Sequence, residues 1–145
     1  MIKVFGYLKR KPGLSPQEFA EYYEHNHVPL VLSKAFMPMV YKRNYIQRGD
    51  AFNIEGTEIS FDCMTELVFA DRDDLSSWMA SLGVDEIARD EENFIDRAAT
   101  RAYVVDERSS AGRAGRQQRQ QLATHSGNWR YAFARLTARA APKGG

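Results

Sequence analysis

His27 is the side chain in this sequence best suited to move a proton, because imidazole has a pKa close to neutral pH. It lies near the end of a helical pattern and two residues before Pro29, where its ring can face a cleft. The alternative is a histidine that hydrogen-bonds the last helical carbonyls and interacts favourably with the helix dipole. His25 is two residues away, hence on another helix face, and we expect it to be exposed.

Two carboxylates, Asp62 and Glu66, are predicted to share one face of a strand. If that face is the interior of a barrel, at least one carboxylate is buried and needs a partner such as Arg43, Arg48 or His27. A pairing with His27 would orient the imidazole and raise its basicity. The alternative is a structural ion pair or an exposed edge. We take His27 and Asp62 as the candidate catalytic residues.

Tyrosines are frequent in the first 107 residues, at positions 7, 22, 23, 41, 45 and 103. For most of them, core packing with the hydroxyl satisfied at the edge explains the residue, whereas one or two that line a pocket would suit a flat aromatic substrate. The candidate substrate-binding residues are Tyr7, Tyr22, Tyr23, Tyr45, Met64 and Glu66. Glycine loops for phosphate, a Ser-His-Asp order, nucleotide fingerprints and metal-ligand spacing are absent, so we expect no cofactor and no metal.

Alternating and helical patterns predict the elements that position these residues. Strands are expected at 2–9, 40–48, 59–69 and 100–106. Ser15 and Glu18 form a capping box that begins a first helix, which Pro29 should break or kink at His27–Val28. Further helices are expected from Asp71 to Gly83, with Leu75, Trp78, Met79 and Leu82 as an apolar stripe, and over 85–97, with Ile87, Phe94 and Ile95 inward.

This order, β-α-β-β-α-β, predicts an α+β domain of ferredoxin-like type. Two helices on one face of a four-stranded sheet leave the other face open. That face would carry Phe5, Tyr7, Tyr45 or its neighbours, and Met64. Exposed aromatic surface of this kind is unfavourable in a monomer, so we expect two sheets to pair face to face in a homodimeric α/β barrel.

Charge divides the chain into a domain, 1–107, and a basic tail, 108–145. The first part has 12 basic and 19 acidic residues, a net charge of −7, and the second has 8 basic and no acidic residues. We expect a flexible tail; the alternative is an arm that binds nucleic acid or a partner, but the aromatic residues of this segment are confined to residues 129–133 and are not interleaved along it. A single cysteine, no signal-peptide pattern and no apolar run of about 18 residues favour a cytoplasmic protein that contacts neither membrane nor nucleic acid.

Three blocks of the sequence resemble the EthD-domain family. The first is KRKPGLSPQEFAEYYEHNHVPLV (9–31), a turn and aromatic helix followed by His-x-Pro-Leu. The others are FDCMTELVFAD (61–71) and DEENFIDRAAT (90–100). Cys63 stands where the family usually has glycine, and the basic tail lies outside the resemblance.

The resemblance implies a homodimeric α/β barrel with a cleft between the sheet and the helices, and it favours His27 as the acid/base residue. Many fungal members are cofactor-free decarboxylases or related lyases of aromatic polyketide pathways. We therefore expect a cofactor-free lyase, a decarboxylase or related cyclase or dehydratase, that acts on an aromatic polyketide-type acid in secondary metabolism. The alternatives are a cofactor-independent monooxygenase or oxidoreductase accessory protein of EthD type, and a non-catalytic dimer that binds a hydrophobic ligand.

Overall fold

A computed structural model describes residues 1–56 and 60–110 of the chain. Met1–Glu107 form one compact unit, with its elements in the order β-α-β-β-α-β that the sequence predicts. Residues 111–145, which make up most of the predicted basic tail, lie outside the described residues.

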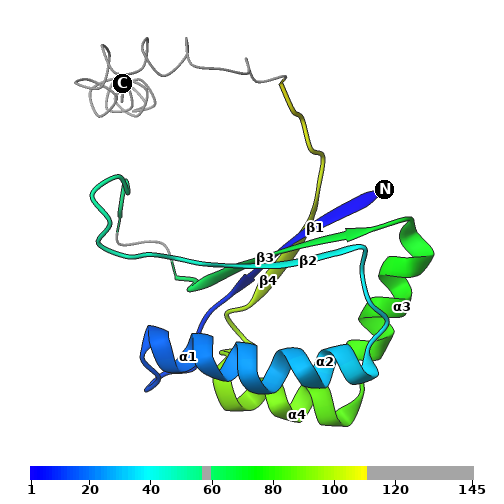
Figure 1. Ribbon diagram of the computed structural model, residues 1–145, viewed down its shortest axis with the longest axis horizontal. Coiled ribbons are helices and arrows are strands. Elements are labelled where there is room, and N and C mark those ends of the chain that lie inside the picture. Colours follow the sequence, from blue (N-terminus) through cyan, green and yellow to red (C-terminus); the bar gives the residue numbers. More distant parts are fainter. Residues whose placement is uncertain (57–59, 111–145) are drawn as a thin grey trace, which may run out of the picture. The chain divides into compact units, whose positions relative to one another are not determined.

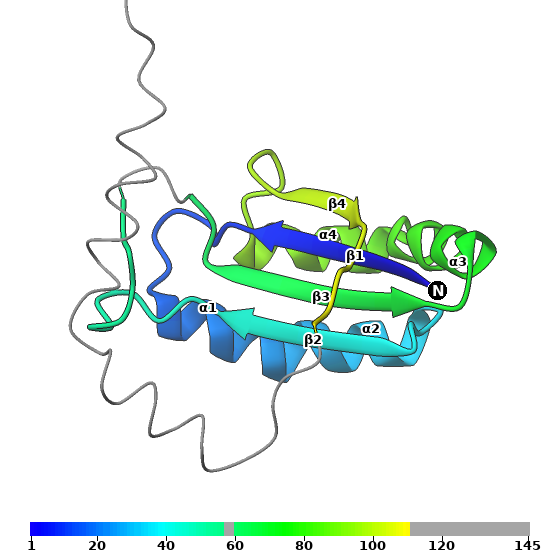
Figure 2. The same cartoon turned by 90° about the horizontal axis from the view of Figure 1, so that it is seen from above.

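The sheet has four antiparallel strands in the spatial order β2-β3-β1-β4 (Figure 2). Their bounds are Ile2–Leu8 for β1, Val40–Tyr45 for β2, Cys63–Phe69 for β3 and Arg101–Val105 for β4. Phe5 of β1 lies opposite Glu66 of β3 on one side and Tyr103 of β4 on the other. This is the ferredoxin-like arrangement, and the expected fold class is confirmed.

The first helical segment begins as predicted but continues past Pro29. In α1 (Pro16–Tyr22), Ser15 and Glu18 form the reciprocal capping box. A π-helical turn follows at Tyr23–His27, in which Val28 donates its backbone N–H to the carbonyl of Tyr23. The segment then continues as α2 (Val28–Lys34), with Pro29 in its first turn. Of the two predicted outcomes, a break is wrong, because the wider π turn directly precedes Pro29 and accommodates a residue that has no N–H to donate; the change from the π turn to α2 falls at His27–Val28, as expected for the position.

Two further helices connect β3 to β4. The helix α3 (Arg72–Leu82) is capped by Asp71, as predicted, and α4 (Asp85–Phe94) follows it directly. Met79 was expected in the apolar stripe of α3 but is 60% exposed, whereas Trp78 is buried. All of the helices among the described residues lie on one side of the sheet, and none of them covers the other face (Figure 1).

The core lies between the sheet and these helices. From the strands it takes Val4 and Leu8 of β1 and the alternate residues Cys63 to Phe69 of β3. Phe19, Tyr23 and Phe94 pack against them from the helices in one aromatic cluster, and Trp78, Ile87 and Val31 form a second cluster with Phe69. Tyr45 packs against the first cluster, so it belongs to the helix-covered face and not to the open face that carries Phe5, Tyr7 and Met64.

The third strand begins at Cys63, four residues later than predicted, and this changes the orientation of the residues before it. Phe61 was expected on the same face as Cys63, but its ring packs against Tyr7 of the open face at 4.9 Å between centroids. Asp62 was expected beside Glu66 on the open face, but it lines a pocket against α1. Residues 60–62 are irregular, so the strict alternation of a strand does not apply to them.

Candidate functional site

The structure places the predicted site residues in three separate regions. His27, Tyr22 and Tyr23 lie where the first helical segment packs against α4, whereas Asp62 and Tyr45 line the pocket beside α1. Tyr7, Met64 and Glu66 lie on the open face of the sheet, where Glu66 pairs with Lys3 at 2.9 Å and with Lys42 at 3.5 Å. His27 and Asp62, the two candidate catalytic residues, are therefore not brought together.

A helix-pair cluster forms around the carboxylate of Asp90 on α4. The Nδ1 atom of His27 lies 2.7 Å from Oδ2 of Asp90, and the hydroxyl of Tyr22 donates to Oδ1 at 2.7 Å. Asn93 in turn donates its side-chain N–H to the oxygen of Tyr22 at 3.0 Å. The carboxylate that orients His27 is therefore Asp90, and the expectation that Asp62 or Glu66 would pair with this imidazole is wrong.

The sequence did not lead us to expect Asp90 at the site, although its helical spacing from two apolar residues indicates that it faces the interior. It lies three residues after Ile87 and four before Phe94, both of which are fully buried. Helical spacing puts these three residues on one face of α4, so an acidic residue there must be paired in the interior.

Electrostatics favour a neutral imidazole at His27. The side chain is only 6% exposed, and burial lowers its pKa below the usual 6.5 although the bond to Asp90 acts in the opposite direction. A carboxylate only accepts hydrogen bonds, so Nδ1 carries the proton and Nε2 presents a lone pair. No buried polar side-chain atom among residues 1–56 and 60–110 lacks a hydrogen bond, and Nε2 makes none, so this nitrogen retains contact with solvent.

A pocket of about 360 Å³ lies between α1 and the end of β2. Its apolar wall comes from Phe19 and Ala20 of α1 and from Tyr45 and Ile46, and its polar groups include Asp62 and Arg48. This volume lies within the range of small-molecule sites.

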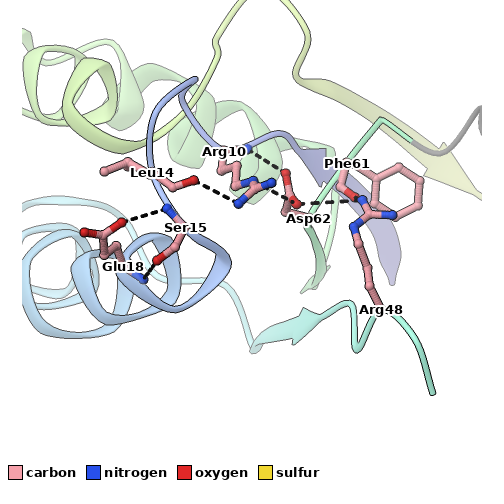
Figure 3. Close-up of polar contacts among 7 residues, drawn as sticks. All are labelled: Arg10, Leu14, Ser15, Glu18, Arg48, Phe61 and Asp62. Atoms are coloured by element: carbon pink, nitrogen blue, oxygen red, sulfur yellow. Dashed lines mark hydrogen bonds and ion pairs between the residues drawn. The ribbon is translucent and has the colours of Figure 1, made fainter.

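A second polar cluster, which we call the pocket cluster, consists of Asp62, Arg10 and Arg48 (Figure 3). In it the two arginine residues hold the carboxylate of Asp62 at the pocket. The backbone N–H of Arg10 donates to Oδ2 at 3.0 Å, while Nε of Arg10 lies 3.4 Å and Nη2 of Arg48 3.7 Å from Oδ1. Arg10 also donates to the carbonyl of Leu14 at 2.8 Å, and Arg48 to that of Phe61 at 2.8 Å. The cluster thereby ties the turn after β1 to the segment that enters β3.

Tyr23 separates the two clusters. Its ring contacts His27 at 5.4 Å between centroids and, on the pocket side, Phe19 at 6.1 Å and Tyr45 at 6.2 Å. It is 2% exposed, and its hydroxyl shares a hydrogen bond of 2.9 Å with that of Tyr41. A ligand in the pocket would therefore touch Asp62 and Tyr45, whereas His27 lies behind the ring of Tyr23.

Tyr45 is held by an ion pair behind the pocket. Its hydroxyl donates to Oε1 of Glu24 at 2.6 Å, and Arg43 binds both oxygens of Glu24 at 3.0 and 2.8 Å. Burial and the neighbouring carboxylate raise the pKa of the Tyr45 phenol well above its usual value. Tyr45 is thus a neutral donor of fixed orientation, and Arg43, expected as a possible partner of Asp62 or Glu66, serves Glu24 instead.

Among residues 1–56 and 60–110, no three His, Cys, Asp or Glu side chains gather as metal ligands would. Over the same ranges, no helix combines the length and apolar character that a membrane crossing requires.

Comparisons with known proteins identify the family. Residues 11–98 match the EthD domain. A crystal structure of the Arabidopsis thaliana protein At3g17210 superposes with a TM-score of 0.55 at 15% identity, covering 77% of this chain and 99% of that one. An EthD-family protein from Bacillus halodurans gives a TM-score of 0.49 at 20% identity, covering 74% and 100%.

The search of curated proteins found no significant match. The Arabidopsis structure supports the fold alone, because its identity to this chain is low. The domain match extends over more than half of the 145 residues and includes both the capping box of α1 and the His27–Asp90 pair. The chain belongs to the EthD domain family.

Proposed function

We propose that the protein is a cofactor-free lyase that acts on an aromatic, polyketide-type acid, with decarboxylation as its reaction. The observation that carries this proposal is the His27–Asp90 pair, in which one imidazole nitrogen is bound to a carboxylate and the other has no hydrogen-bond partner among the described residues. Such a pair can transfer a proton at neutral pH without a metal or an organic cofactor. The aromatic lining of the pocket, Phe19 and Tyr45, supports a planar substrate.

His27 would act as the proton donor in this reaction. The neutral imidazole first takes a proton from solvent at Nε2. The bond between the ring carbon and the carboxylate then breaks, CO₂ leaves, and the electron pair that remains on carbon takes that proton from Nε2, which returns the imidazole to its neutral form. Asp90 stabilises the imidazolium form and keeps Nε2 directed away from the carboxylate. Asp62 is the second candidate for this role, because it is the carboxylate that a ligand in the pocket would touch.

The test compares His27→Ala with His25→Ala, which changes an exposed histidine two residues away. Release of CO₂ from dihydroxybenzoic acids and their methyl derivatives is measured for both variants and for the unchanged protein. We expect His27→Ala to lower kcat by a factor on the order of 10² to 10⁴ and His25→Ala to leave it unchanged. Full turnover in His27→Ala, with loss in Asp62→Asn, would transfer the catalytic role to Asp62.

A second candidate is a non-catalytic protein that binds a hydrophobic ligand. The position of Tyr23 between the imidazole and the pocket favours it, because a ligand in the pocket does not reach His27 without movement of that ring. Binding of these acids without CO₂ release in the unchanged protein would support this function over the lyase.

We also propose that the protein is a homodimer with its open sheet faces in contact. Phe5, Tyr7 and Met64 lie on this face, and Tyr103 is 57% exposed beside them. Burial of apolar surface stabilises by about 25 cal/mol per Å², which favours pairing of two such faces. Truncation after Glu107 should leave the dimer intact in size-exclusion chromatography with light scattering, and Tyr7→Asp should dissociate it. A folded monomer of the full chain at micromolar concentration would contradict the proposal.

A further inference from the structure

We infer that the pocket between α1 and the end of β2 binds a phenolic ring and that Asp62 accepts the hydrogen bond of its hydroxyl. This inference concerns binding and a specificity-determining residue, so it goes beyond the proposed reaction and holds whether His27 or Asp62 transfers the proton.

The apolar part of the pocket fits a flat ring. Phe19 and Tyr45 meet edge to face at 6.1 Å between centroids, and Phe19 is 1% exposed, so this wall is fixed by the core. Ala20 and Ile46 add aliphatic surface beside the two rings. Contacts of an aromatic ligand with the faces and edges of such rings contribute favourably to its binding free energy. The volume of about 360 Å³ admits a single substituted ring.

The polar part of the pocket selects a neutral donor. The side chain of Asp62 is 10% exposed, and a carboxylate has about four acceptor sites, of which the Arg10 backbone N–H takes one at 3.0 Å. The guanidinium groups of Arg10 and Arg48 lie within 3.7 Å of Oδ1, so a cationic ligand would meet two positive charges. A hydroxyl donates to the carboxylate without that repulsion. The ring lining and the carboxylate together therefore specify a phenol.

Asp62 also has a structural role, since it links the turn after β1 to the entry of β3. A variant of Asp62 could weaken binding of every ligand by disturbing this link. The test therefore measures discrimination between two ligands that differ by a single hydroxyl, which a general loosening of the pocket would not remove selectively.

The probes are benzamide and the three hydroxybenzamides, which are neutral and differ only in the hydroxyl group. Dissociation constants are measured with the full chain by ¹H–¹⁵N NMR titration, which also reports which backbone amides shift. We expect at least one hydroxybenzamide to bind roughly tenfold or more tightly than benzamide, because a hydrogen bond to a charged acceptor contributes that much. The amide signals that shift should be those of residues 17–20 and 45–48.

Asp62→Asn should reduce the preference to less than about threefold, because the acceptor is no longer charged. The control is Glu92→Gln, which neutralises an exposed carboxylate of α4, outside the pocket, and should leave the preference unchanged. Ala20→Leu places a larger side chain in the apolar part of the pocket and should weaken the binding of benzamide and of the hydroxybenzamides alike. This variant tests the location of the binding site even if Asp62→Asn fails to fold. Equal binding of all four probes, shifts outside the pocket, or a preference that survives in Asp62→Asn would overturn the inference. None of these outcomes depends on turnover, so they leave the test of His27 independent.

Discussion

Asp90 and Asp62 are each the centre of a polar cluster, but the groups around them differ in kind. Asp90 binds two uncharged donors, the imidazole of His27 and the phenol of Tyr22, between two packed helices. Asp62 binds a backbone N–H and two arginines, whose side chains are 33% and 41% exposed. The buried imidazole of His27 loses its acceptor when the carboxylate is removed, whereas exposed arginines can turn to water. The cluster around Asp90 orients the imidazole of His27 as proton transfer requires, whereas the cluster around Asp62 holds a carboxylate at the wall of the pocket.

The largest difference between the clusters should appear in stability. We expect Asp90→Ala to lower the free energy of unfolding by about 2 to 3 kcal/mol, because the buried imidazole of His27 and the partly buried phenol of Tyr22 lose their acceptor. Asp62→Ala should cost about 1 kcal/mol, since its ion pairs reach solvent. Urea unfolding followed by circular dichroism measures both values.

The control for this comparison is Glu92→Ala, which removes an exposed carboxylate from the same helix as Asp90 and should change the free energy of unfolding by less than about 0.5 kcal/mol. If Asp90→Ala and Asp62→Ala lowered the free energy of unfolding by the same amount, the surroundings of the two carboxylates would not differ as described.

A smaller effect on stability is expected at the start of α1, where Ser15 is the N-cap residue. Its hydroxyl accepts from the N–H of Glu18 at 3.1 Å, and the Glu18 carboxylate accepts from the N–H of Ser15 at 2.7 Å (Figure 3). Ser15→Ala should lower the free energy of unfolding by about 1 kcal/mol.

Ser77→Ala is the matched control, because it changes an exposed serine inside α3 and should be neutral or slightly stabilising. A similar decrease in the free energy of unfolding in Ser15→Ala and Ser77→Ala would argue against a specific role of Ser15 as the N-cap residue.

The sequence predicted the parts of this structure that local patterns determine. Alternation assigned both faces of β1 and of β3 from Cys63 onward, and the capping box located the start of α1. The Phe61–Asp62 orientation was missed because a strand pattern was extended into residues that are irregular. Asp90 was missed as the partner of His27 because the pair joins residues 63 positions apart, and no local pattern states which carboxylate meets a buried histidine.

The predicted break at Pro29 shows a different kind of limit. Proline excludes an ordinary α-helical hydrogen bond but does not say whether the chain stops, bends or widens its turn. Here the helix widens over Tyr23–His27, and this turn is also the one that carries His27 to the face of α4. Turns of this type occur often at functional sites, which is consistent with the role proposed for the histidine.

The finest difference between the clusters is their response to pH. The pKa of His27 is lowered in the folded protein by burial, whereas the pocket cluster of Asp62, Arg10 and Arg48 contains no histidine. Below the unfolded pKa of 6.5 the unfolded chain therefore binds more protons at this position than the folded chain, so stability falls as the pH decreases from 7 towards 5. His27→Gln removes this contribution. The midpoint of urea unfolding should consequently decline less between pH 7 and pH 5 in His27→Gln than in the unchanged protein, while Asp62→Asn should retain the contribution of His27. A decline of the same size in His27→Gln and the unchanged protein would mean that the imidazole is not held neutral beside Asp90, and the proton-transfer role would then lose its electrostatic basis.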